Sequence, residues 1–250
     1  MPEQTCERCG GTGWKIVEKD GLSGAQRCEC AFAARGEALL RRARIPVNYA
    51  DDHFDNFSDR GSSDLRAIQL LLIRYCQDFP AGDPPGLLLI GEPGTGKTHL
   101  AVAVLRRLIE HGFEGVFMDY QNLLDRIRAG YDPLSGESPR AAYEEAMDAE
   151  VLLLDDLGAH RVTDWVEDTV TSIITHRCNE RKPVIATTNL PDAEMGGTLV
   201  ERMSDGAPSR YDIKSSLAEK IGMRARSRLF EMCRIVRMPK VGDYRVASRK

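Results

Sequence analysis

The chain has 250 residues, a length that allows one substantial α/β core and a small appended module. Its composition, 42% hydrophobic and 29% charged, is that of an ordinary globular protein, and no apolar run approaches the ~20 residues that a membrane-spanning helix requires. The first residues, 1–13, are polar and contain cysteine instead of a charged and then apolar leader, so we expect a cytoplasmic protein with no membrane partner.

The net charge of −4 conceals a basic C-terminal end. Between Lys214 and Lys250 there are 11 Lys and Arg residues against 3 Asp and Glu, a net charge of +8. Such an end is typical of a surface that binds a polyanion or an acidic partner. A solvated basic helix has the same composition, and charge alone does not separate the two alternatives.

Four of the seven cysteines lie within the first 30 residues, as one C-x-x-C pair and one C-x-C pair. In a reducing compartment two such pairs favour a tetrahedral Zn²⁺ site over disulfides. No histidine is near, so the site would be all-sulfur, closed and structural. An iron–sulfur cluster and thiols without a metal are the alternatives. The expected zinc ligands are Cys6, Cys9, Cys28 and Cys30.

A basic helix is predicted from Ala31 to Arg44, and Pro46 ends it. We place a domain boundary at this point, with a zinc-binding module over residues 1–45 and a larger domain over residues 46–250. The spacing of apolar residues predicts the first helix of the larger domain over Ser63–Phe79.

Leu87–Ile90 is an apolar strand that runs into a glycine-rich turn and then into a helix over His99–His111. The segment Gly91–Thr98 matches G-x-x-x-x-G-K-[ST] at each fixed position. Glycines let the backbone approach a ligand closely, and the N–H groups of the turn and of the helix N-terminus attract phosphate. Lys97 is expected to reach the β- and γ-phosphates, and the Thr98 hydroxyl to coordinate Mg²⁺. The segment therefore predicts a nucleoside triphosphate site.

Two further apolar strands end in polar side chains. Val151–Leu154 precedes Asp155 and Asp156, and Pro183–Asn189 ends in an amide. Because the carboxyl ends of parallel strands meet beside a phosphate loop, Asp155 can hold the Mg²⁺ shell and Asp156 can orient or deprotonate the attacking water. The amide of Asn189 can hydrogen-bond a water or the γ-phosphate.

The rest of the chain continues the alternation of strands and helices. Capping boxes predict helices over Asp164–Glu180 and from Ser216 to about Glu231. Ile235–Met238 is the last predicted strand, and Pro191–Asp212 is expected to be a surface loop. A further strand and a short helix are predicted at Gly115–Met118 and Gln121–Arg128. This alternation predicts an α/β fold with a parallel sheet and right-handed crossovers.

Four segments occur in the order found in the AAA+ ATPases of the DnaC-type helicase loaders, which are relatives of the bacterial replication initiator and of the IstB-type transposition helpers. These segments are Gly91–Thr98, Asp155–Asp156, Thr187–Leu190 and Ile221–Leu229. The chain resembles this family over roughly residues 45–245, and its cysteine module resembles the zinc-binding arm with which loaders engage the replicative helicase. The resemblance implies an AAA+ P-loop NTPase with a five-stranded parallel sheet flanked by helices, and too few residues follow Glu231 for a full C-terminal lid.

The resemblance also implies a role for each motif residue. It assigns ATP binding to Gly91, Glu92, Pro93, Gly94, Thr95, Gly96, Lys97, Thr98, His99 and Asp155. It assigns catalysis to Asp156, Asn189 and Arg228, and magnesium binding to Thr98 and Asp155. The imidazoles of His99 and His111 are expected to be surface or capping groups more often than ligands.

Arg228, in a Ser-Arg-Leu context, resembles the arginine finger that one subunit offers to its neighbour's ATP. An arginine far from its own phosphate loop can neutralise transition-state charge only from an adjacent subunit, an effect of about 10³–10⁵ in rate. Self-assembly through the ATP sites is therefore expected, while a surface or DNA-contacting arginine is the alternative. The segment Phe54–Phe57 resembles the strip that lies near the adenine in this family.

These expectations combine into an ATP-dependent DNA replication protein that binds single-stranded DNA and loads the replicative helicase. Hydrolysis is expected to be slow, because Asp156 stands where many relatives have a longer Glu, and oligomer-dependent, because Arg228 would act on the ATP of a neighbouring subunit. The alternative is an IstB-type transposition helper that assembles on DNA and recruits a transposase. A small metabolic kinase would use the same phosphate loop but leaves the Thr-Thr-Asn strand end and the arginine helix unexplained.

Overall fold

A five-stranded parallel sheet forms the centre of the molecule. The computed structural model describes residues 6–10, 12, 14–19, 22–27, 29–130, 139–160, 162–191 and 216–244. The strand order in the sheet is β4, β5, β6, β3 and β7. In that order the strands are Gly115–Asp119, Val151–Asp155, Val184–Thr188, Gly86–Ile90 and Cys233–Arg237, each parallel to its neighbours. The predicted α/β fold and its five-stranded parallel sheet are confirmed.

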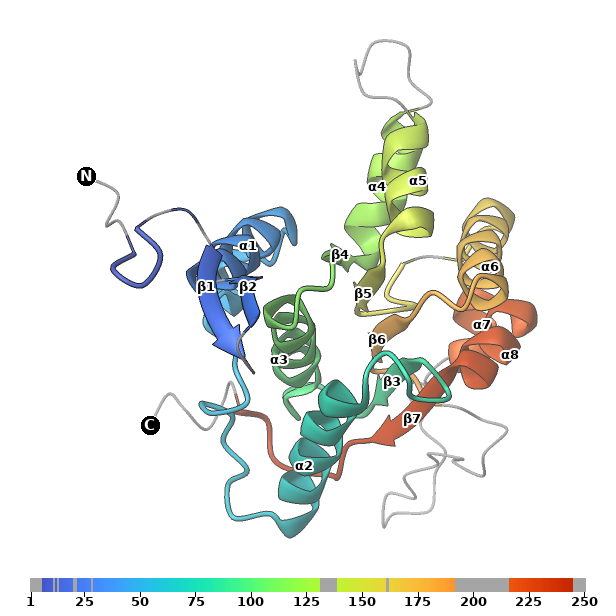
Figure 1. Cartoon of the computed structure of the whole chain (residues 1–250). Helices are drawn as coiled ribbons and strands as arrows, with labels where there is room; N and C mark the ends of the chain where they lie inside the picture. The colour runs from blue at the N-terminus through green and yellow to red at the C-terminus, as the bar shows by residue number, and fades with distance from the viewer. Residues whose placement is uncertain are drawn as a thin grey trace, which may run out of the picture.

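Helices cover both faces of this sheet, which explains why its central strands are almost wholly apolar. Figure 1 shows α2 and α3 on one face and α6, α7 and α8 on the other. Successive side chains of β3 alternate between the two cores, so Leu87 and Leu89 belong to one and Leu88 to the other. These helices are α2 (Ser63–Asp78), α3 (Lys97–Glu110), α4 (Tyr120–Ala129), α5 (Pro139–Asp148), α6 (Asp164–Asn179), α7 (Leu217–Ile221) and α8 (Met223–Met232).

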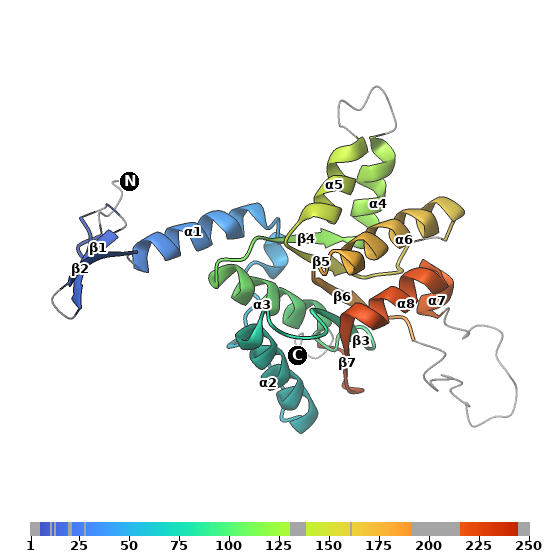
Figure 2. The ribbon, with the colours of Figure 1, turned by 45° about the vertical axis from the view of Figure 1, so that its right-hand side comes forward.

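The N-terminal part is a hairpin carried on a helix. Strands β1 (Trp14–Lys19) and β2 (Leu22–Arg27) pair antiparallel, and α1 (Glu29–Arg42) follows them. Figure 2 shows α1 leading away from the sheet, with the hairpin beyond its first turns. The other end of α1 joins the main core, because Leu39 and Ala43 are buried there and the Phe117 N–H donates to the Ala43 carbonyl at 2.7 Å.

One predicted helix cap and the continuity of one predicted helix were wrong. The side chain that caps α6 is Thr163, which accepts from the Val166 N–H, and not Asp164 in a capping box. The helix predicted from Ser216 to Glu231 is divided at Gly222, whose φ of 84° lies outside the helical region. A Cβ at this glycine would lie 2.4 Å from Glu167 Oε1, so close packing against α6 also requires a glycine here. The capping box between Ser216 and Glu219 is present as predicted.

Sequence periodicity missed the β1–β2 hairpin and helix α5. Both elements are short, and α5 begins beside residues 131–138, which lie outside the described part of the chain. The predicted surface loop Pro191–Asp212 also lies outside it after Pro191. Within the described residues, no helix is long and apolar enough to cross a membrane.

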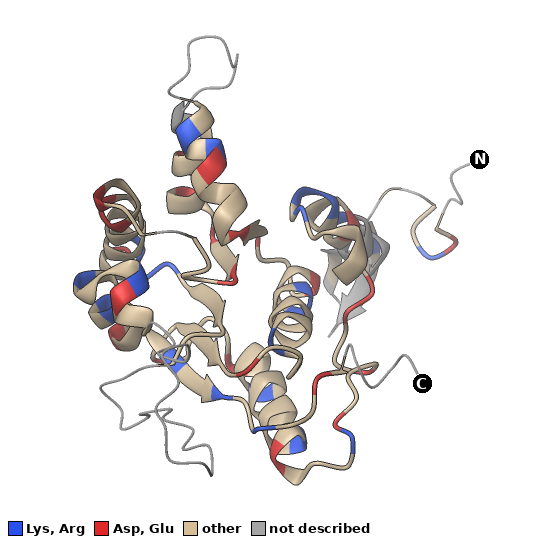
Figure 3. Ribbon diagram, turned by 180° about the vertical axis from the view of Figure 1, so that it is seen from behind, with Lys and Arg blue, Asp and Glu red and all other residues tan. Residues whose placement is uncertain are grey.

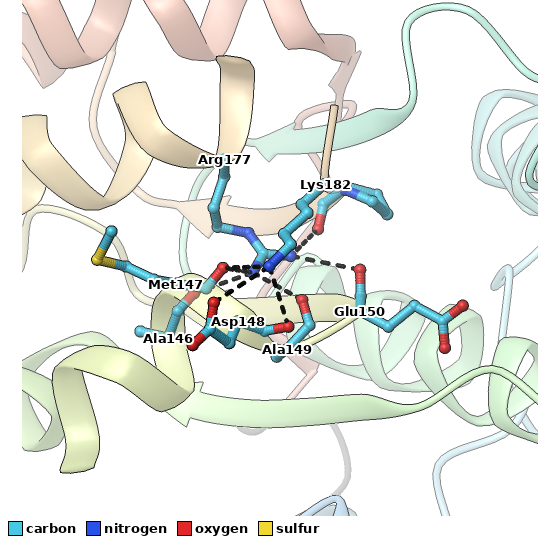
Figure 4. Close-up of polar contacts among 8 residues, drawn as sticks. Ala146, Met147, Asp148, Ala149, Glu150, Arg177 and Lys182 are labelled. Carbon is cyan, nitrogen blue, oxygen red and sulfur yellow. Dashed lines mark hydrogen bonds and ion pairs between the residues drawn. The ribbon is translucent and has the colours of Figure 1, made fainter. Parts of the chain in front are cut away.

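A buried arginine ties the loops at the amino ends of β5 and β6 to α6 (Figure 4). Arg177 is fully buried, and its guanidinium donates to the carbonyls of Ala146 and Ala149 at 2.9 Å and of Pro183 at 2.7 Å. The first two carbonyls lie at the end of α5, where a helix leaves acceptors without intrahelical partners. One side chain of α6 thus closes the C-terminus of α5 and fixes where two central strands begin.

Candidate functional site

The phosphate loop joins β3 to α3 and has the backbone conformation that its glycines permit. Gly94 and Gly96 have φ values of 73° and 90°, in the left-handed region. A Cβ at Gly94 would lie 2.0 Å from Asp243 Oδ1, and one at Gly96 would lie 2.7 Å from Phe57 Cε2. The loop is therefore packed on both sides by distant segments, and its N–H groups precede the helix N-terminus that the motif requires.

Lys97 begins α3 and is only 5% exposed. Its ammonium group donates to the Glu92 carbonyl at 2.8 Å, and the Thr95 hydroxyl donates to the same carbonyl at 2.8 Å. The side chain thus lies folded over the loop whose ligand it is predicted to bind. A triphosphate would offer this ammonium group charged oxygens, which are stronger acceptors than a carbonyl.

Three elements meet at Asp155, the last residue of β5. Its Oδ1 accepts from the Thr98 hydroxyl at 3.0 Å and from the Thr187 hydroxyl at 2.6 Å. Burial raises the pKa of Asp155, and the charge of Asp156 adds to this, while the two threonine hydrogen bonds act in the opposite direction. A divalent cation would relieve the cost of a buried carboxylate, and carboxylate and hydroxyl oxygens are the ligands that Mg²⁺ prefers. The donor set therefore fits the predicted magnesium site.

Asp156 and Asn189 also come together, from neighbouring strands. The Asn189 side-chain amide donates to Asp156 Oδ1 at 2.9 Å, and the Asp156 N–H donates to the Thr187 hydroxyl at 3.0 Å. Asp156 has a φ of 54°, an uncommon value outside glycine that turns the chain sharply after the strand. Thr187 thus links both aspartates, a role that sequence reasoning missed although its position before Asn189 was noted.

Pro93–Thr98, Asp156 and Asn189 line one cavity of about 250 Å³ that also reaches two more distant segments, whereas Asp155 is not among its lining residues and contacts it through the Thr98 hydroxyl. The segment 48–60 contributes Asn56 and Phe57, whereas Phe54 is buried in the core, and the proximity of this strip to an adenine stays a prediction. The C-terminal segment contributes Tyr244, whose ring lies 4.9 Å from the Arg60 guanidinium. Arg60 and Tyr244 were not predicted, because only the fold brings them to this cavity.

His99 lies in the wall between the loop and the segment 48–60. Its side chain is 23% exposed, with Nδ1 3.2 Å from Asp52 Oδ1 and Nε2 2.8 Å from the His53 carbonyl. Burial disfavours the charged ring, but these two contacts outweigh it and raise the pKa of His99. His99 lines the cavity, whereas His111 is exposed at the C-terminal cap of α3, and whether either ring is a ligand stays a prediction.

Arg228 lies on α8 and does not line this cavity. It donates to Glu231 at 2.6 Å, and with Arg224 and Ser227 it borders a separate groove of about 960 Å³ along α6. Figure 3 shows Lys and Arg residues along the α7–α8 pair, at the left of that view. Within the described residues, Arg228 therefore lies apart from the cavity that the phosphate loop lines, and its role as an arginine finger stays a prediction.

The four predicted zinc ligands are described only in part. Cys6 and Cys9 lie in a tight turn in which the Gly10 N–H donates to the Cys6 carbonyl at 2.8 Å. Cys28 lies outside the described residues, and so does the side chain of Cys30. Among the side chains that are described, no group of three or more His, Cys, Asp and Glu could hold a metal ion. The zinc site therefore stays a prediction.

Several known proteins are similar to this chain in sequence or in fold. A family model described as IstB-like ATP binding protein matches residues 30–205. The uncharacterized protein YqaM of Bacillus subtilis is 27% identical over 66% of this chain, and the match spans 55% of YqaM, about half its length. The replicative helicase loader DnaC of Escherichia coli is 22% identical over 69% of either chain. A crystal structure of the DnaC helicase loader, 28% identical, has a TM-score of 0.62 and covers 78% of this chain and 100% of that one.

Proposed function

The chain belongs to the family of IstB-like ATP binding proteins, and from this premise we propose that it hydrolyses ATP and loads a replicative helicase onto single-stranded DNA. One observation carries the ATPase part of the proposal. The phosphate loop, the Thr98–Asp155 pair and the Asn189–Asp156 pair all border the same edge of the sheet. The domain that carries these groups also has the AAA+ fold of the DnaC helicase loader.

Each residue has a distinct part in the proposed hydrolysis. The loop N–H groups and Lys97 bind the β- and γ-phosphates, and Thr98 and Asp155 hold Mg²⁺. The ion, when bound, neutralises charge on the phosphate oxygens. Asp156 orients the attacking water or accepts its proton, and Asn189 fixes the Asp156 carboxylate through the 2.9 Å hydrogen bond.

Arg228 completes the site of a neighbouring molecule in this proposal. Its groove on α6 and α8 shares no residue with the ATP cavity, so one copy presents the cavity and the next presents the arginine. Arg228 pairs with Glu231 on its own helix and also contacts the Cys178 thiol of α6, at the surface, and such exposed pairs contribute little energy. A γ-phosphate would therefore compete easily for the guanidinium.

The N-terminal module is proposed to be the arm that binds the helicase. The β1–β2 register pairs Trp14 with Arg27, so the first residue of β1 and the last residue of β2 are at the same end of the hairpin. This arrangement supports a shared zinc site for the two cysteine pairs. On β1 the side chains of Trp14 and Ile16 share one face and are 51% and 83% exposed, an apolar surface suited to a protein partner. We retain the division into residues 1–45 and 46–250 as part of this proposal.

Sizing the protein alone, with ATP, and with ATP and a hexameric replicative helicase tests the proposal. We expect ATP-dependent self-assembly, a complex with the helicase, and an ATP-dependent shift of single-stranded oligonucleotides that weakens steeply with salt. The basic C-terminal end motivates the last expectation. A protein that binds ATP but neither a helicase nor single-stranded DNA would refute the loader function and leave only the ATPase.

The family match also supports a second candidate, a transposition helper. Such a protein would assemble with ATP on duplex DNA and recruit a transposase. Competition between duplex and single-stranded oligonucleotides of equal length separates the two candidates. A preference for duplex DNA together with capture of a transposase would favour the helper.

A further inference from the structure

His99 joins the phosphate loop to residues 48–58. We call this whole segment, which includes Phe54–Phe57, the strip. The residue follows Thr98 in the first turn of α3, so its backbone belongs to the phosphate-binding helix. Its ring reaches away to two acceptors on the strip, the carboxylate of Asp52 and the carbonyl of His53. The Phe57 ring lies 5.3 Å from the imidazole, tilted by 58°. One side chain thus contacts the strip at three points.

The part of the strip that His99 holds is internally bonded. The Asn56 carboxamide accepts from the His53 N–H at 2.9 Å and donates to the Asp51 carbonyl at 2.6 Å. Both hydrogen bonds join Asn56 to residues on the other side of this turn, at Asp51 and His53. We therefore expect residues 51–56 to move as one unit. Fixing Asp52 and His53 therefore also fixes Asn56 and Phe57, which line the cavity.

Among the described residues, this part of the strip has other contacts with the core, with α2 and with α3, since Phe54 is buried in the core and the Arg107 guanidinium of α3 lies 5.9 Å from its ring. Phe57 packs against Gly96, and the Arg106 guanidinium donates to the Ala50 carbonyl two turns further along α3. The Gln69 side chain donates to the Phe54 carbonyl at 2.6 Å from α2. Compared with Phe57, Arg106 and Gln69, His99 is the one side chain that both makes polar contacts to the turn, at Asp52 and His53, and joins it from α3 while lining the cavity.

We infer that His99 is a positioning residue for the nucleoside part of the ligand, holding the strip against the phosphate loop so that the base and ribose are bound. The inference rests on the proposed ATP site and assigns phosphate binding and nucleoside binding to different parts of that site. The loop and Lys97 bind phosphates without the strip, whereas the base and ribose need the strip in place. Loss of the His99 side chain should therefore weaken ATP binding and leave the binding of a bare triphosphate chain unchanged.

Calorimetry with Mg²⁺–ATP and with Mg²⁺–tripolyphosphate tests this division on the full chain. For His99→Ala we expect ATP binding to weaken about tenfold, the value of one net hydrogen bond, and tripolyphosphate binding to change less than about twofold. His99→Asn keeps a donor near the Nδ1 position and His99→Gln keeps one near the Nε2 position. Each should restore part of the ATP affinity. His111→Gln, an exposed histidine at the other end of the same helix, is the matched control.

Each outcome of this experiment is decisive. If His99→Ala weakens both ligands equally, or neither, or if His111→Gln has the same effect as His99→Ala, the inference is wrong. If all His99 variants bind neither ligand while their thermal melting remains that of wild type, His99 acts on the phosphates and not through the strip, which also overturns it. If the wild-type chain binds neither ligand, the proposed ATP site itself fails.

Discussion

Replacing Arg177 with methionine should lower the free energy of unfolding by about 3 kcal/mol. Three short hydrogen bonds to buried carbonyls are lost, and bonds from a charged donor contribute about 2 kcal/mol each. Burial of the guanidinium acts in the opposite direction, since it lowers the pKa of Arg177 to about 10. That shift corresponds to about 3 kcal/mol of unfavourable charge burial, which methionine does not carry. The difference between the lost hydrogen bonds and the relieved charge burial leaves a net loss of about 3 kcal/mol in the free energy of unfolding. A loss of this size is also expected when a buried polar network is broken.

Urea unfolding followed by far-ultraviolet circular dichroism measures this change, provided that the m-value stays constant. Lys182→Met is the matched control, because this lysine donates to the same chain turn at Met147 and Asp148 but is 29% exposed. Its loss should cost less than about 1 kcal/mol. An Arg177→Met protein within about 1 kcal/mol of wild type would refute the assignment of this arginine as the closure of α5.

The folded Arg177→Met protein should retain its affinity for ATP. Arg177 contacts the amino-terminal beginnings of β5 and β6, whereas Asp155 and Asn189 lie at their carboxyl ends. A loss of ATP affinity as large as the loss of stability would mean that strand position, and not only stability, depends on this network.

Four further substitutions test the site itself. Lys97→Ala should abolish detectable ATP binding in calorimetry, because no other described cation lies on the phosphate loop. Asp156→Asn should keep ATP binding but lower the hydrolysis rate at least about 10²-fold in a phosphate-release assay. Arg228→Ala should still assemble with ATP, with hydrolysis reduced by about 10³ or more, and unchanged hydrolysis would rule out the finger. Cys6→Ser should lower the zinc content, measured by elemental analysis, from one zinc per chain to none. A wild-type protein without zinc would contradict the predicted zinc site.

Local patterns in the sequence were enough to predict most of the secondary structure and the phosphate site. Apolar runs without alternation predicted β3, β5 and β6, because strands covered on both faces need no polar side. The phosphate loop was recognisable because its glycines and Lys97 act through neighbouring backbone. The two acids at the end of β5 and the amide after β6 were expected near it, since parallel strands present their carboxyl ends together.

The tertiary structure alone determined which distant side chains share these groups. Three contacts join residues that lie far apart in the sequence and that no periodic pattern connects. They are the hydrogen bond from Thr187 to Asp155, the contact of Arg60 with the Tyr244 ring, and the hydrogen bond from Arg177 to the Ala146 carbonyl. At Gly222 the glycine itself permits the φ of 84° that divides the helices, whereas its close contact with Glu167 of α6 depends on the tertiary packing. Local preference depends on neighbours along the chain, whereas these contacts depend on how the helices pack on the sheet, and that is decided only when the whole chain folds.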